Sequence, residues 1–345
     1  MLEEWPVAAI GRVSDPAVQL PFTRAPLGAG DRIAAVRADF FLDPALRLTE
    51  QERALMTAML HGLIGSIAEE LRVRLTDDLA HRTECDPEDL VALLRDAGLL
   101  ASDRLITMLV YRTDSARVAQ VAPRNGPGAL LTGWSGDEDP NVAAAAMALV
   151  IARGRSRDRY GRPGLALADC YADLAVELVH AVAAALAKRC PITAHGALAA
   201  AATDLLSRHD EEQRADALEA RLVLLLEAAG KIEPELVLAL ARAGEAGLMA
   251  ETLSRMAGIS GEDSWCLTMQ PGGLGLPLLL RLANQPRAMA AALFVEFGQA
   301  FGIGDPAEAI DRFDSVDDAA AEDERRRLRL PSLYRAALKA LDAHG

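Results

Sequence analysis

The sequence predicts an all-α protein, and three observations carry that prediction. Hydrophobic residues make up 51% of the 345 positions but aromatic residues only 4%, so the core must consist mainly of Ala, Leu and Val. Ala and Leu favour helices, whereas strands favour β-branched and aromatic side chains. Apolar residues also recur at helical spacing behind Ser, Thr or Asp caps, and no alternating strand pattern of useful length occurs.

Length, charge and cysteine content limit the class of protein. A chain of this length exceeds one ordinary core, which predicts two domains or one extended helical stack. The net charge of −14 argues against a general nucleic-acid binder or a protein that binds anionic membranes, because such proteins need a basic surface. The longest apolar run, Val142–Ala152, is too short for a membrane span, the N-terminus is acidic, and the four cysteines form no CxxC pair. We therefore expect a cytoplasmic protein with free thiols.

The first helix is expected to begin directly after Thr49. Residues 1–48 are rich in Pro and Gly and predict an irregular arm, with Phe40 and Phe41 as its anchors on the first helices. Thr49 and Glu52 then form a capping box ahead of an apolar-periodic run. The arm therefore ends where the capping box opens the first helix.

Three further helix starts follow before residue 152. Asp86-Pro87 supplies an N-cap and a first-turn proline, and Gly98 ends the helix that follows. Ser102-Asp103 starts the next helix, and Asp139-Pro140 repeats the cap and the proline. Short helices with repeated caps are typical of stacked helical hairpins. We therefore predict a degenerate HEAT-like array over residues 49–152, without a strict period.

Residues 153–164 predict a linker. The run from Arg153 to Pro163 reads RGRSRDRYGRP, and its glycines and proline break the helical pattern. Residues 165–303 then predict a helical bundle, in which Asp210 with Gln213 caps a long helix that ends at Gly230. Residues 304–345 predict a charged tail that closes with an amphipathic helix over about 332–343.

Three stretches of the second half carry a resemblance to a known family. They are Ala172–Val179, Pro234–Ile259 and Gly272–Ala283, and their Leu, Ala and Gly patterns cover roughly residues 165–297. They resemble the bacterial, uncharacterised and all-helical domain of unknown function 2336 family. The resemblance implies a helical-repeat half joined to a second helical half, and it implies no activity.

No catalytic or metal-binding set emerges from the sequence. The two near-matches to GxSxG, at Ser135 and Ser260, lack the last glycine, and Ser260 is explained as a helix N-cap. Glu177 and His180 have the spacing used in di-iron bundles, but no second Glu-x-x-His pair occurs. Gly272-Gly273-Leu274-Gly275 lacks the spacing of a phosphate-binding loop. We therefore expect no enzyme activity, no cofactor and no metal ion.

The arginines of residues 153–164 are the candidate binding residues. Clustered guanidinium groups can bind phosphates or carboxylates in a bidentate manner, so one hypothesis is a docking site for an acidic protein surface or for a nucleotide signal. The alternative is a solvated loop whose arginines pair with the protein's own carboxylates. The candidates are Arg153, Arg155, Arg157, Arg159 and Arg162.

The sequence as a whole predicts a non-enzymatic adaptor. Stacked helical hairpins often provide surfaces for protein partners, and no convergent catalytic residues argue for an enzyme. The alternative is a sensor that binds a nucleotide or another small anion at the arginine-rich segment between the domains. The protein partner is not identified by the sequence, and a homodimer is compatible with it.

Overall fold

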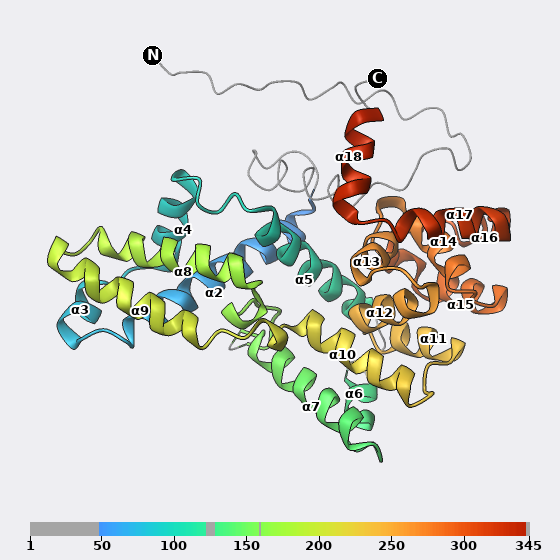
Figure 1. The fold of residues 1–345 in the computed structure, drawn as a ribbon, viewed down its shortest axis with the longest axis horizontal. Helices are drawn as coiled ribbons and strands as arrows, with labels where there is room; N and C mark the ends of the chain where they lie inside the picture. The colour runs from blue at the N-terminus through green and yellow to red at the C-terminus, as the bar shows by residue number, and fades with distance from the viewer. Residues whose placement is uncertain (1–47, 122–127, 159, 343–345) are drawn as a thin grey trace.

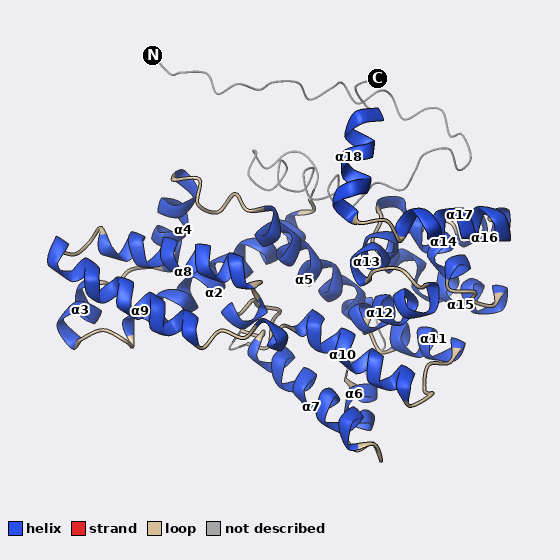
Figure 2. Cartoon of the chain, in the orientation of Figure 1, coloured by secondary structure: helices blue, strands red, loops and turns tan. Residues whose placement is uncertain are grey.

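The chain folds into helices throughout the part that the structure describes. The structure is a computed structural model that describes residues 48–121, 128–158 and 160–342. Over these residues it contains 17 α-helices and no β-strand, which confirms the all-α prediction (Figure 2). No helix in these ranges combines the length and hydropathy needed to cross a membrane. The predicted anchors Phe40 and Phe41 lie outside the described residues.

The buried side chains form two hydrophobic clusters. The first cluster combines the early helices with a pair from the middle of the chain, and the short helix α3 (Asp77–Arg82) lies beside it without burying a side chain. In Figure 1 these helices occupy the left half of the molecule. The members of the first cluster are α2 (Glu50–Arg72), α4 (Pro87–Asp96), the first half of α5 (Asp103–Val121), α8 (Ala172–Ala187) and α9 (His195–Ser207).

The second cluster contains the end of α5 and most of the later helices. Helix α5 connects the two, because Leu109 is buried in the first cluster and Val118 in the second. The other members are α6 (Ala129–Trp134), α7 (Pro140–Arg155), α10 (Ala215–Ala228), α11 (Pro234–Arg242), α12 (Ala246–Ala257), α13 (Gly261–Thr268), α14 (Gly275–Leu282), α15 (Arg287–Phe297), α16 (Pro306–Ser315) and α17 (Asp318–Leu328).

The predicted helix starts rest on observed hydrogen bonds. The Thr49 hydroxyl accepts from the Glu52 amide at 3.2 Å, and the Glu52 carboxylate accepts from the Thr49 amide at 3.1 Å, which completes the capping box of α2. Asp86 and Asp139 each accept from a backbone amide two residues on, and each precedes a proline at the start of its helix. Local sequence therefore specifies where α2, α4 and α7 begin.

Two local expectations were wrong. Asp210 caps the 3₁₀ turn η3 (Glu211–Gln213), and helix α10 begins only at Ala215. Arg153 and Arg155 were expected in a linker but form the last turn of α7. A glycine inside a helix destabilises it by only about 1 kcal/mol relative to alanine. The packing of Ala152 and the ion pairs of Arg153 hold the last turn of α7, so Gly154 does not end the helix.

The clusters divide the chain differently from the predicted domain boundaries. The chain leaves the first cluster within α5, returns to it for α8 and α9, and leaves it again at α10. Residues 304–345 were expected to form a charged tail, yet Phe313 and Leu328 are buried in the second cluster. The HEAT-like arrangement stays a prediction, because two interleaved clusters do not themselves establish a repeat.

The glycine-rich loop before α14 serves packing. Gly272 and Gly273 have φ values of +74° and +63°, a region that favours glycine. A Cβ on Gly273 would collide with Ile303, whose backbone lies against the loop. The loop can therefore pass this close to Ile303 only with glycine at position 273.

Candidate functional site

The structure separates the predicted arginine cluster into one partly buried residue and several exposed ones. Arg153 is directed inward, where it pairs with two carboxylates. Arg155 and Arg157 are exposed and donate to backbone carbonyls, Arg155 to Gln213 at 3.1 Å and Arg157 to Gly161 at 2.8 Å. The Arg162 guanidinium lies 5.7 Å from the centre of its neighbouring tyrosine ring. Arg159 lies outside the described residues.

Arg153 belongs to a polar network that joins four helices around two buried glutamates. Its guanidinium donates to Glu219 of α10 at 2.8 Å and to Glu245, which precedes α12. The Tyr111 hydroxyl of α5 donates to the second oxygen of Glu219 at 2.5 Å, and the Gly128 amide donates to Glu245 at 3.3 Å. Arg153 therefore pairs with the protein's own carboxylates, which was the alternative to docking.

The charge states of this network follow from its burial. Burial alone would lower the pKa of Arg153, but Glu219 and Glu245 outweigh that effect and hold its pKa above the ordinary value. Burial and the adjacent Glu219 carboxylate raise the pKa of Tyr111 well above 10. Arg153 therefore stays charged and Tyr111 stays a hydroxyl donor, which suits a structural role.

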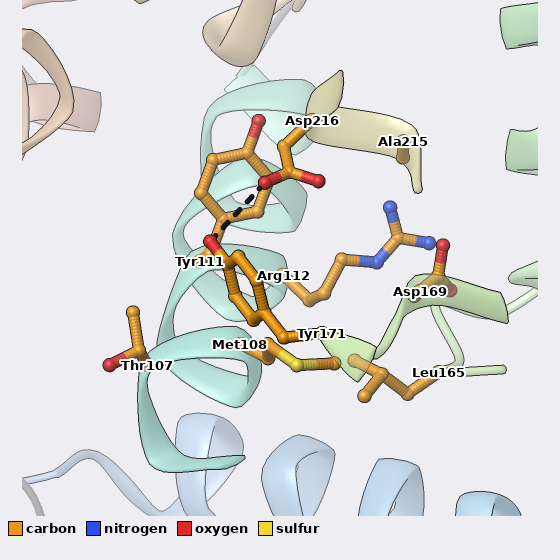
Figure 3. A pocket seen from close by; sticks show the side chains of 9 residues that line it. All are labelled: Thr107, Met108, Tyr111, Arg112, Leu165, Asp169, Tyr171, Ala215 and Asp216. Atoms are coloured by element: carbon orange, nitrogen blue, oxygen red, sulfur yellow. Dashed lines mark hydrogen bonds between the residues drawn. The ribbon is translucent and has the colours of Figure 1, made fainter. Parts of the chain in front are cut away.

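A small cavity lies next to this network, where α5 meets the segment that precedes α8 and the first residues of α10 (Figure 3). Its volume is about 70 Å³, well below the roughly 300–1,000 Å³ of most ligand sites. Most of the lining is apolar. The lining residues are Thr107, Met108, Tyr111, Arg112, Leu165, Asp169, Tyr171, Ala215 and Asp216.

The polar groups around this cavity have partners within the fold. Arg112 donates to the carbonyls of Ser156 at 3.1 Å and Gly164 at 3.3 Å, which holds the segment after α7 in place. Asp169 accepts from the Ser156 hydroxyl at 2.5 Å. Tyr171 lies under the Arg214 guanidinium, 3.9 Å from its ring centre. These contacts anchor residues 156–158 and 160–171, and they engage the described polar groups of the cavity within the fold.

The other sequence candidates are not brought together. Glu177 and His180 lie exposed on α8, and the described residues hold no cluster of three or more potential metal ligands. Ser260 caps α13, accepting from the Asp263 amide at 3.1 Å, as its N-cap interpretation expects. Ser135 follows the end of α6, and the described part of the chain contains no strand that could place it on a nucleophile turn.

The C-terminal helix α18 (Ser332–Asp342) presents an apolar face to solvent. It buries none of its side chains, and Figure 1 shows it projecting from the second cluster. Its attachment is polar: Arg335 donates to both oxygens of Asp263 at 2.7 Å, and both side chains are about 15% exposed. Its exposed apolar side chains are Leu333 at 84%, Tyr334 at 54%, Leu338 at 41% and Leu341 at 71%.

Helix α7 carries a second exposed apolar face. Met147, Val150 and Ile151 are all exposed on it, and they lead toward the exposed Arg155 and Arg157. Sequence reasoning missed this surface because residues 142–152 are apolar on every side, so periodicity does not distinguish the packed face from the exposed one. The α18 helix itself was predicted, but its exposure was not.

Comparison with known proteins adds no relative. No protein-family model, no curated protein and no solved structure matches the chain. The resemblance to the domain of unknown function 2336 family therefore stays a prediction.

Proposed function

We propose that the protein is a non-enzymatic adaptor that binds a protein partner through α18 and acts in the cytoplasm. The observation that carries the proposal is the exposure of the whole apolar face of this helix. Large apolar side chains gathered on one exposed element indicate an interaction surface, whereas single exposed ones do not. The polar Arg335–Asp263 contact fixes the base of α18 while leaving its apolar side chains unpacked.

The partner should present an apolar groove. Tyr334, Leu338 and Leu341 have the spacing i, i+4 and i+7, which places them on one side of the helix. Amphipathic helices with this spacing bind by inserting the anchors into a hydrophobic groove. A bound groove would bury side chains that the monomer leaves in water, and that burial supplies the driving force.

The anion-sensor alternative has less support. Arg153 is already neutralised by two carboxylates, and the cavity beside it is small and carries Asp169 and Asp216 in its lining. A thermal-shift series with nucleotides distinguishes the two functions, because a ligand that binds only the folded state raises the unfolding temperature with concentration. An adaptor should show no such rise.

Site-specific photo-crosslinking tests the adaptor proposal. A photoreactive residue in place of Leu338 should give one discrete adduct in the native host, and the same residue at the exposed Val176 of α8 is the matched control. Adding Leu341→Glu should abolish the Leu338 adduct without unfolding the protein, because exposed substitutions usually change stability by less than about 0.5 kcal/mol. The same adducts from both positions, or an adduct that persists with Leu341→Glu, would contradict the proposal.

A further inference from the structure

The outer face of α7 combines exposed aliphatic side chains with small neighbours. Ile151 is 56% exposed, Met147 46% and Val150 41%, all within about one and a half turns. Ala144 is also exposed, and it lies seven residues, about two turns, before Ile151 on the same side of the helix. The opposite side of α7 is buried, with Leu149 and Ala152 in the second cluster. One helix thus has a packed face and an unpartnered apolar face.

This face is complementary to itself when two copies run antiparallel. With a two-fold axis between Met147 and Ala148, Ile151 lies as far to one side of the axis as Ala144 lies to the other. Each Ile151 therefore meets an Ala144 of the second copy, a large side chain against a small one. A two-fold interface requires this kind of self-complementary surface, since the same patch is used twice.

The charges at the two ends of α7 obey the same symmetry. Glu138 lies two residues before the first residue of α7 and Arg157 two residues after its last residue, so the two charges lie at opposite ends of the helix. Both side chains are exposed, and the Arg157 guanidinium donates to the backbone carbonyl of Gly161 at 2.8 Å rather than to a carboxylate. In the antiparallel arrangement the end of α7 that carries Arg157 lies beside the end that carries Glu138 in the second copy. Such complementarity sets orientation and suppresses the parallel arrangement.

We propose that α7 is a homodimer interface, in which two copies pair antiparallel through this face. The proposal concerns a different helix from α18 and does not depend on the adaptor function. A contact built mainly on one helix pair is at the small end of specific interfaces, so we expect dissociation in the micromolar range. A different protein on the α7 face is the competing occupant, and it would leave the purified protein monomeric.

Sedimentation equilibrium of the purified full chain tests the dimer. The wild-type protein should shift from monomer to dimer across the micromolar range. Ile151→Glu should weaken dimerisation at least about 100-fold, because it places two carboxylates in an apolar interface. Val295→Glu is the matched control, since Val295 is an exposed aliphatic residue of α15, and it should leave the dimer unchanged. Circular dichroism checks that both variants remain folded.

A charge swap tests the antiparallel geometry. Glu138→Arg and Arg157→Glu should each weaken the dimer about tenfold, because each replaces two attractions by two repulsions. The double variant Glu138→Arg/Arg157→Glu should restore the wild-type affinity, which an interface elsewhere would not do. A wild-type protein that stays monomeric throughout the micromolar range, a dimer that survives Ile151→Glu, or a double variant as weak as the single ones overturns the proposal.

Discussion

Replacing Arg153 by alanine should strongly destabilise the fold. The guanidinium of Arg153 is the cation that pairs with both Glu219 and Glu245, whose side chains are only 8% and 4% exposed. The substitution leaves both carboxylates buried without that cation, in a medium that solvates charge poorly. Because Arg153 joins α7 to α10 and to the start of α12, the lost contacts span the second cluster.

The size of the effect follows from the burial of the two acids. Removing one partner of a buried ion pair typically costs about 3–5 kcal/mol, because the remaining charge is left uncompensated. The Arg153 side chain is 23% exposed, so water can reach the vacated position, and we expect about 3 kcal/mol. Arg155→Ala is the matched control: it removes the same charge from the same helix turn, and its one backbone hydrogen bond is exposed. It should cost less than about 0.5 kcal/mol.

Urea unfolding followed by circular dichroism measures both variants at neutral pH. Adding Glu219→Gln and Glu245→Gln to Arg153→Ala should recover part of the loss, because the two buried charges disappear together with their partner. Free energies of unfolding for Arg153→Ala and Arg155→Ala within about 1 kcal/mol of each other would refute the reasoning.

Three further predictions rest on single sites. Gly273→Ala should lower the free energy of unfolding in urea by about 2–4 kcal/mol, because the φ of Gly273 is +63° and the added Cβ meets Ile303. The control Gly230→Ala, at φ +67° in open space, should lower it by about 1 kcal/mol. Equal losses for the two variants would contradict this prediction. Burial raises the pKa of Glu251, so the folded state resists its ionisation and loses stability as the pH rises above 4.5. Glu251→Gln should therefore stabilise the protein at neutral pH and not below that value, and an equal gain at both pH values argues against it. Burial also raises the pKa of Cys170 to about 12, so mass spectrometry should find it unalkylated by iodoacetamide in the folded protein, and rapid alkylation would contradict its burial.

Several elements were predictable because their determinants are local. The capping box at Thr49, the Asp-Pro start of α7 and the N-cap at Ser260 involve residues within one helical turn, so the sequence alone specifies them. The amphipathic α18 was predicted for the same reason, from the spacing of its apolar residues. The charge of residues 304–345 led to the wrong expectation of a tail, because single apolar residues such as Phe313 carry the packing there.

The candidate site was less predictable. The linker expectation grouped Arg153 with Arg155 and Arg157 by their closeness in the sequence. Whether an arginine pairs with groups inside the fold or faces solvent depends on residues that are distant in the sequence. For Arg153 these are Glu219 and Glu245, 66 and 92 positions away. Composition showed that the protein has surplus carboxylates, but it did not show which of them reach the end of α7.

Helix content and helix starts therefore follow from the chain itself, since hydrogen bonds and caps form between neighbours. Three features depend on which helices pack together: the contribution of α5 to both clusters, the pairing of Arg153 with two buried carboxylates, and the exposure of one face of α7. An all-apolar helix such as α7 has no periodicity to orient it, so only its neighbours determine which side remains in water.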